Sequence, residues 1–207
     1  MQRGQTYARV SAMCVSHTRS HGFTLPEVLM ALSVGSMLML SAAQLYPLLR
    51  QRSQSLSRHF QLDQLLRGTL FNIEKDLRRA GFCNGECTGK AVIIGNSEGE
   101  RPNSCVIIAY DLNRNGRWDL PGSSEPDYFG YRLRQGGIET QRGAENCTGV
   151  GWEKLLDPSE VKVTEFNLAE SVSPRDGHGY SLTLSANWND APNIHRRIEK
   201  RVAGYQQ

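Results

Sequence analysis

Two stretches of this 207-residue sequence lack a whole class of side chain. Residues 1–22 contain no acidic residue, and residues 28–49 contain no charged residue. Three of the 24 Lys and Arg residues lie in residues 1–22, which leaves 21 basic against 21 acidic residues in the rest of the chain. The pI of about 8.6 therefore reflects the N-terminus, and it is no evidence for nucleic-acid binding.

The sequence also lacks a catalytic pattern, internal repeats and low-complexity tracts. After residue 22, histidine occurs only at positions 59, 178 and 195, and none of the three lies in a nucleophile or metal motif. Residues 85–91 look superficially like a phosphate-binding loop, but the spacing is short and Ala91 stands where a hydroxyl is needed. We therefore expect one domain, no enzyme activity and no cofactor, apart from a calcium alternative discussed below.

The uncharged stretch 28–49 predicts a membrane-spanning helix. As an α-helix it would extend about 33 Å, enough to cross the hydrocarbon core of a bilayer. Arginines precede it, so we expect the N-terminus in the cytoplasm and the rest of the chain exported. A cleaved secretory signal peptide is the alternative, but the apolar run is too long and no small-residue cleavage pattern follows it before Arg50.

One acid, Glu27, stands at the start of this stretch, where an unpaired carboxylate is costly to bury. The basic leader, the pair Gly22-Phe23, Glu27 five residues after that glycine and the long apolar run resemble the N-terminus of type IV prepilins and pseudopilins. The resemblance implies that prepilin peptidase cuts after Gly22 and that Phe23 becomes an N-methylated N-terminus. It also implies that Glu27 pairs with the N-terminal amine of a neighbouring subunit. A solvated charge at the membrane boundary is the alternative for Glu27.

An amphipathic helix is predicted from about residue 48 to residue 80. Apolar residues recur there at spacings of three to seven, and Gly81 marks the expected end of the helix. Pro47 is expected to bend the continuous helix. The recurring apolar residues are Leu56, Phe60, Leu66, Leu70, Ile73 and Leu77.

Beyond Phe82 the helical period gives way to short alternating runs separated by Gly, Asn and Pro. These runs predict an α+β, pilin-like fold, in which a long N-terminal helix packs on one antiparallel sheet or a pair of sheets. We expect four segments: a leader at 1–22, a membrane or filament-core helix at 23–49, the amphipathic half of the helix at 50–82 and a β-rich periplasmic head at 83–207. The predicted strands are 91–95, 104–110, 128–134, 137–141, 150–155, 161–168, 180–188 and 194–203.

Two further segments are similar to the larger minor pilins of the PilW and GspJ type: residues 71–82 at the helix end, and residues 129–133 in a predicted strand of the head. The chain as a whole resembles the prepilin peptidase-dependent protein B family. The resemblance implies a minor pilin or pseudopilin that starts or caps a type IV pilus or a type II secretion pseudopilus. Its implied partners are prepilin peptidase, the major pilin, other minor subunits and the inner membrane, and its implied final place is the filament tip.

Four cysteines remain after the leader, which itself contains Cys14. In a small exported domain an even number of cysteines predicts disulfides, here two, with three pairings left open. Zinc is a weaker alternative because only one pair is close in sequence. The four residues are Cys83, Cys87, Cys105 and Cys147.

Residues 111–119 match the first half of a calcium-binding loop. The bidentate acid of such loops is absent, because its position is Gly122 and the nearest later carboxylate is Glu125. Asn115-Gly116 is also a strong hairpin-turn signal, which we favour over calcium. The oxygen ligands of the calcium alternative would be Asp111, Asn113, Asn115 and Asp119.

Residues 195–201 form the one concentrated basic stretch of the exported part. One hypothesis is a binding module at the filament tip that contacts DNA or a surface through this stretch. We favour an edge strand, in which lysine and arginine discourage aggregation, and do not expect nucleic acid as a partner.

Overall fold

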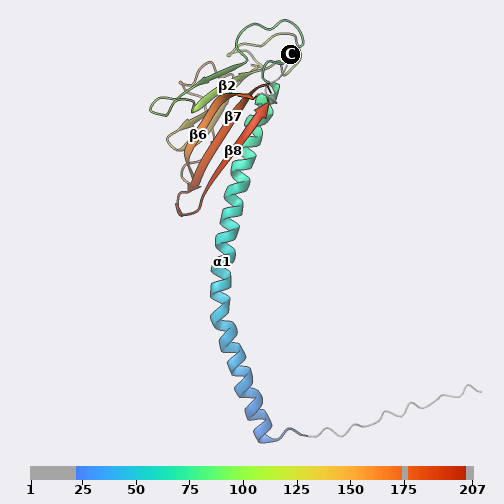
Figure 1. Ribbon diagram of the computed structural model, residues 1–207, viewed down its shortest axis with the longest axis vertical. Coiled ribbons are helices and arrows are strands. Elements are labelled where there is room, and N and C mark those ends of the chain that lie inside the picture. Colours follow the sequence, from blue (N-terminus) through green and yellow to red (C-terminus); the bar gives the residue numbers. More distant parts are fainter. Residues whose placement is uncertain (1–21, 174–176, 204–207) are drawn as a thin grey trace, which may run out of the picture. The chain divides into compact units, whose positions relative to one another are not determined.

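Helix α1 spans Leu25–Arg79 in a computed structural model that describes residues 22–173 and 177–203 (Figure 1). The predicted leader, apart from Gly22, lies outside these described residues. The helix continues through Pro47, which has no N–H to donate to the carbonyl of Ala43. The bend expected there stays a prediction. The chain divides into two units between residues 51 and 52, in the middle of this helix.

In the first unit, the uncharged stretch 28–49 is exposed along its whole length. Helix α1 is long and apolar enough to cross a membrane, and its most apolar part is not buried against the rest of the described chain. Exposed apolar surface of this extent needs a cover from outside the chain, either lipid or other subunits.

In the second unit, one face of α1 is buried and forms part of the hydrophobic core. Its apolar residues recur every three or four positions, as the geometry of a half-buried helix requires. Leu56 and Phe60, which we predicted to belong to this stripe, are instead 72% and 61% exposed. The buried apolar residues of the helix are Leu62, Leu66, Leu70, Ile73 and Leu77.

The helix ends where the sequence predicts. Gly81 adopts a φ of 88°, a conformation that costs glycine little and other residues more. Its N–H donates to the carbonyl of Ala109 (2.9 Å), and the N–H of Asp111 donates to the carbonyl of Phe82 (2.9 Å). The chain leaving the helix is therefore hydrogen-bonded at once to the segment that follows strand β2.

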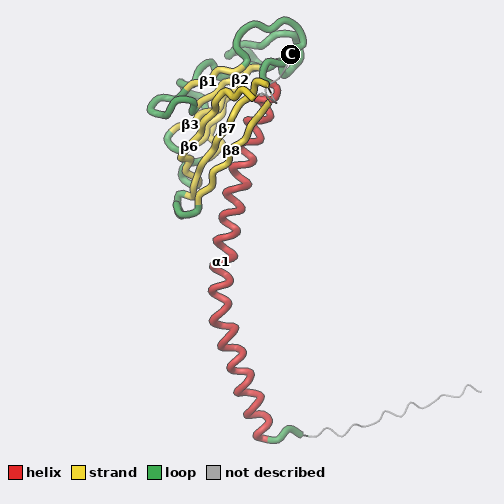
Figure 2. Tube along the Cα trace, in the orientation of Figure 1, coloured by secondary structure: helices red, strands yellow, loops and turns green. Residues whose placement is uncertain are grey.

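The head contains two antiparallel sheets (Figure 2). The first has five strands in sequence order: β1 (Val92–Gly95), β2 (Cys105–Ala109), β3 (Tyr128–Arg134), β4 (Gly137–Arg142) and β5 (Glu153–Leu156). The second has three strands, also in sequence order: β6 (Val161–Ser173), β7 (Gly177–Trp188) and β8 (His195–Ala203). The predicted α+β arrangement of a long helix on antiparallel sheets is confirmed.

One core joins the buried face of α1 to both sheets. Val106 and Ile108 of β2 and Leu182 and Leu184 of β7 are fully buried in it. Figure 1 shows β8 beside the second half of α1, and ion pairs between the two elements agree with this placement. The helix is thus an integral part of the head from Leu62 onward.

Candidate processing and assembly site

The predicted cleavage point lies immediately before helix α1. The carbonyl of Thr24 accepts the N–H groups of Glu27 (3.0 Å) and Val28 (3.2 Å), which begins the first turn. Phe23 is 81% exposed. A Cβ atom added at Gly22 would meet nothing within 4 Å, and the backbone there is not in the left-handed region. Neither space nor backbone conformation demands this glycine, so its role is to be sought outside the folded chain.

Glu27 lies in the first turn of α1, where a negative charge interacts favourably with the positive end of the helix dipole. Its side chain is exposed and has no hydrogen-bond or ion-pair partner among the residues that the structure describes. The carboxylate is therefore accessible to a positive group from another chain.

Asp76 anchors the second half of the helix to the five-stranded sheet. Its carboxylate accepts hydrogen bonds from the hydroxyls of Tyr110 (3.0 Å) and Tyr131 (2.6 Å), and all three side chains are buried. Burial raises the pKa of both tyrosines, and the nearby carboxylate raises it further. Sequence reasoning missed this contact, although Asp76 lies in the 71–82 segment.

Glu74 joins the helix to the three-stranded sheet. Its carboxylate pairs with Arg78 on the same helix (2.7 Å) and with Lys200 on β8. Burial raises the pKa of Glu74, but hydrogen bonds from Lys200 and Arg78 outweigh this effect, so the pKa lies below its ordinary value. The helix is thus tied to both sheets by neighbouring acids.

The basic stretch 195–201 lies in β8, at the edge of its sheet, as expected. Arg196 pairs with Asp63 of α1 (2.7 Å), Arg197 pairs with Glu165 of β6, and Lys200 pairs with Glu74. Three of its cations therefore have acidic partners within the head. This arrangement weakens the interpretation of the stretch as a phosphate-binding patch.

The four predicted cysteines form two disulfides among the residues that the structure describes. Cys83 pairs with Cys87 directly after the helix, and Cys105 of β2 pairs with Cys147 in the loop between β4 and β5. The first closes a ring of five residues, and the second joins segments 42 residues apart. The sequence had left this pairing open.

Arg132 supports the loop that carries Cys147. This fully buried side chain pairs with Glu139 (2.7 Å) and donates to the carbonyls of Cys147 (3.0 Å) and Gly149 (3.4 Å). Its guanidinium also lies over the ring of Trp152, 4.2 Å from the centroid. A buried charge is tolerated here because a carboxylate pairs with it and two backbone carbonyls accept its N–H groups. Arg132 lies in the 129–133 segment that resembles minor pilins, but the sequence did not predict its burial or its contacts.

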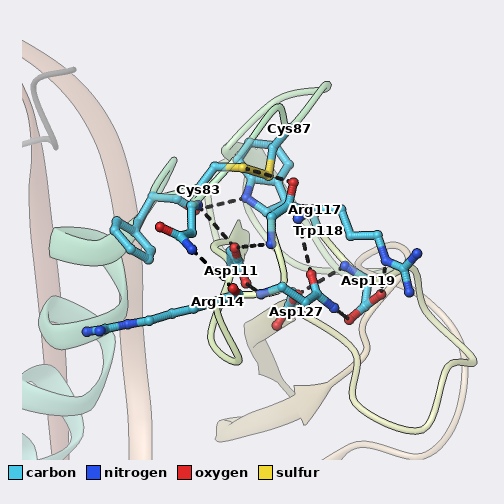
Figure 3. The surroundings of a disulfide bond; sticks show 12 residues. Cys83, Cys87, Asp111, Arg114, Arg117, Trp118, Asp119 and Asp127 are labelled. Carbon is cyan, nitrogen blue, oxygen red and sulfur yellow. Dashed lines mark hydrogen bonds and ion pairs between the residues drawn. A yellow bond between two sulfur atoms is a disulfide. The ribbon is translucent and has the colours of Figure 1, made fainter.

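The loop at residues 111–119 closes on itself and on the small disulfide ring (Figure 3). The buried carboxylate of Asp111 accepts the N–H groups of Asn84 (3.1 Å), Asn115 (3.0 Å) and Gly116 (2.9 Å). Burial raises the pKa of Asp111, but these hydrogen bonds lower it more. The pKa of this carboxyl group therefore lies below its ordinary value. The indole N–H of Trp118 donates to the carbonyl of Phe82 (3.0 Å), which fixes the loop to the helix end.

The other residues of the calcium alternative lie in the same loop. The side-chain amides of Asn113 (3.2 Å) and Asn115 (2.6 Å) donate to the carboxylate of Asp119, which also pairs with Arg117. The four predicted ligands are therefore close together but are hydrogen-bonded to one another or to the backbone. Among the described residues, no group of three or more His, Cys, Asp or Glu side chains is placed to hold a metal ion. The hairpin turn that we favoured at Asn115-Gly116 is wrong, because strand β2 ends at Ala109 and strand β3 begins only at Tyr128, so these residues lie inside a long loop.

Comparison with known proteins assigns the chain to a family. The family model for prepilin peptidase-dependent protein B matches residues 55–204, and the model of the prokaryotic N-terminal methylation motif matches residues 17–43. The prepilin peptidase-dependent protein B of Escherichia coli K12 is 36% identical over 174 residues, covering 84% of this chain and 88% of that protein. The chain belongs to this family.

A second relative of this chain comes from Haemophilus influenzae Rd. That uncharacterized protein is 30% identical over 183 residues, covering 66% of this chain and 76% of its own length. No solved structure matches. The predicted resemblance to prepilins and to this family is confirmed.

The methylation motif of the family member contains Gly22, Phe23 and Glu27 and extends into the uncharged stretch. It implies processing by prepilin peptidase, and the apolar helix agrees with anchoring in the inner membrane before assembly. The family is a pilin-like, structural one. The roles of the single residues, and the place of the chain in a filament, go beyond this assignment.

Proposed function

We propose that this chain is a minor pilin or pseudopilin that starts or caps a filament, in a type IV pilus or a type II secretion pseudopilus. One observation carries the proposal. Glu27, without a partner in the described chain, begins an exposed, uncharged helical stretch five residues after Gly22. The same helix α1 ends in a disulfide-bonded head.

In this proposal the chain has four functional segments. Residues 1–22 form the cytoplasmic leader, 23–49 the membrane and filament-core helix, 50–82 the amphipathic half of the helix, and 83–207 the periplasmic head. Prepilin peptidase hydrolyses the peptide bond between Gly22 and Phe23. The freed amine of Phe23 is methylated and keeps its positive charge.

Glu27 then serves assembly. An acid among apolar helices carries a desolvation penalty of several kcal/mol unless a positive group accompanies it. The N-terminal amine of an adjacent subunit supplies this group, and each charge compensates the other. Because an unpaired Glu27 is unfavourable, the pairing sets the axial position of one subunit against the next.

The head supports a role at the tip. Its two sheets and their connecting loops make a bulky domain, which would pack poorly as the repeating subunit of a thin filament. A single copy at the end of the filament avoids this crowding. The partners are then prepilin peptidase, other minor subunits and the major pilin.

Filament counts in a deletion strain test the proposal. Loss of the gene should sharply reduce surface filaments, and the wild-type gene should restore them. Glu27→Gln should fail to restore them although the protein is still made, whereas Glu98→Gln, at an exposed turn of the head, should restore them. Unchanged filament numbers in the deletion strain would contradict the proposed role.

A further inference from the structure

An open groove lies between helix α1 and strand β8 in the second unit. We define this α1–β8 groove by Leu56, Ser57, His59 and Phe60 of the helix and His195 and Arg196 of the strand. Its volume is about 850 Å³, and sites that hold ligands in other proteins measure about 300–1,000 Å³.

The groove has two apolar anchors. Leu56 and Phe60 are four residues apart on α1, so they lie on the same helix face one turn from each other. They are 72% and 61% exposed, although the neighbouring apolar face of the helix, from Leu62 onward, is buried. Two large apolar side chains in line on a helix form the kind of ridge against which a second helix packs.

The charge beside these anchors is positive. The carboxylate of Asp63 accepts hydrogen bonds from both Arg67 and Arg196, so one acid compensates only one of two guanidinium groups. Arg52, one turn before Leu56, adds a further cation, and it has no acidic partner among the described residues. The groove is therefore complementary to an apolar surface that carries acidic side chains.

The same charges disfavour a second copy of this chain as the occupant. Packing two copies through this face would bring the cations Arg52, Arg67 and Arg196 of one copy near the cations of the other. Each copy would contribute only Asp63 to compensate them, and like charges at an interface are unfavourable. The occupant is therefore expected to be a different chain.

We propose that the α1–β8 groove binds an amphipathic helix of another subunit, whose apolar face covers Leu56 and Phe60 and whose acidic side chain reaches Arg196. This inference rests on the proposed function, since it needs a partner subunit, and it names the surface and the chemistry of that contact. It also agrees with a single copy at one place in an assembly, because like charges disfavour the packing of two copies through this groove.

Two fluorescent synthetic helical peptides with the same leucine face test the inference, one with glutamates and one with lysines at the polar edge. The full chain is held in lipid nanodiscs and binding is measured by fluorescence anisotropy. The wild-type protein should bind the glutamate peptide at least tenfold more tightly than the lysine peptide. Phe60→Ala should weaken binding of the glutamate peptide, and because Phe60 is exposed, this variant should fold normally.

Arg196→Glu and Arg197→Glu form a matched pair. They are adjacent on β8, point to opposite faces of the sheet, and each loses one ion pair, with Asp63 or Glu165. Arg196→Glu should reverse the preference towards the lysine peptide, and Arg197→Glu should retain the wild-type preference.

Equal binding of both peptides, or the same effect from both variants, would overturn the inference. Self-association of the wild type that Phe60→Ala abolishes would overturn it in favour of a second copy. A failed filament assay with intact peptide selectivity would instead count against the proposed function alone.

Discussion

The buried carboxylate of Asp76 on helix α1 accepts a 2.6 Å hydrogen bond from the hydroxyl of Tyr131 on strand β3. The two residues are 55 positions apart in sequence. With Tyr110 as a second donor, the contact fixes the end of the helix against the five-stranded sheet. These contacts therefore couple the end of the helix to the stability of the head.

Asp76→Asn should destabilise the head measurably. The amide retains one acceptor oxygen but loses the charged acceptor that serves both tyrosines, and hydrogen bonds to charged groups contribute about 1.5–3 kcal/mol. We expect the free energy of unfolding of the full chain in detergent micelles to fall by about 2 kcal/mol. Urea unfolding followed by tryptophan fluorescence measures it. Asp190→Asn, which removes an exposed pair with Arg58, is the control and should cost less than about 1 kcal/mol.

Alkaline pH should destabilise the head through the same tyrosines. The pKa values of Tyr110 and Tyr131 are raised by burial and by Asp76, so the folded state favours their neutral form. This stability is fully present below the unfolded-state pKa of about 10, and it is lost as the pH rises above that value. Spectrophotometric titration should find fewer tyrosines ionising near pH 10 in the folded than in the urea-unfolded protein. Tyr131→Phe should reduce the pH dependence of stability; an unchanged dependence would contradict this explanation.

The two disulfides should contribute unequally. In the chain-entropy model the cost of removing a disulfide grows with the loop that it closes. Cys105→Ala with Cys147→Ala, which opens a separation of 42 residues, should lower the free energy of unfolding by about 4 kcal/mol. Cys83→Ala with Cys87→Ala, which opens a separation of 4 residues, should lower it by about 2 kcal/mol. Denaturant unfolding curves of the two double variants measure both losses in the free energy of unfolding. A larger loss for the Cys83–Cys87 variant would show that the small ring contributes more than loop closure explains.

Calcium should leave the stability of the wild-type head unchanged. The carboxylate of Asp111 is occupied by three backbone N–H groups, and the amides of Asn113 and Asn115 direct their N–H groups at Asp119. Thermal melts in excess calcium and in excess chelator should therefore give the same Tm. A calcium-dependent rise in Tm that Asp119→Asn removes would instead establish the calcium alternative.

Local pattern predicted most of the fold. The alternation in the segment beginning at Val161 and the turn signals between runs located all eight strands, and Gly81 located the helix end. Strand β6 extends beyond its predicted end to Ser173, and strand β7 begins before its predicted start, at Gly177. The extra residues are mostly polar or small and carry no apolar alternation, so the backbone ladder alone defines them.

The sequence did not predict contacts between segments that are far apart along the chain. Strand β5 begins at Glu153 rather than near residue 150, because Gly149 and Gly151 adopt positive φ and Val150 is 90% exposed. The pairing of Cys105 with Cys147 and the buried position of Arg132 depend on how β2, β3 and the β4–β5 loop meet. Local periodicity does not predict contacts between segments that are distant in sequence. The spacing from Gly22 to Glu27 is local, so the sequence alone was enough to identify it.

Mass spectrometry of the N-terminal peptide of the protein purified from its own cells is the most direct test of the central claim, that this chain is a processed prepilin. We predict a chain that starts at Phe23 with a methylated amine in cells with prepilin peptidase, and an unprocessed leader in cells without the peptidase. A mature chain that still starts at Met1, or one trimmed downstream of Arg50, would contradict the account.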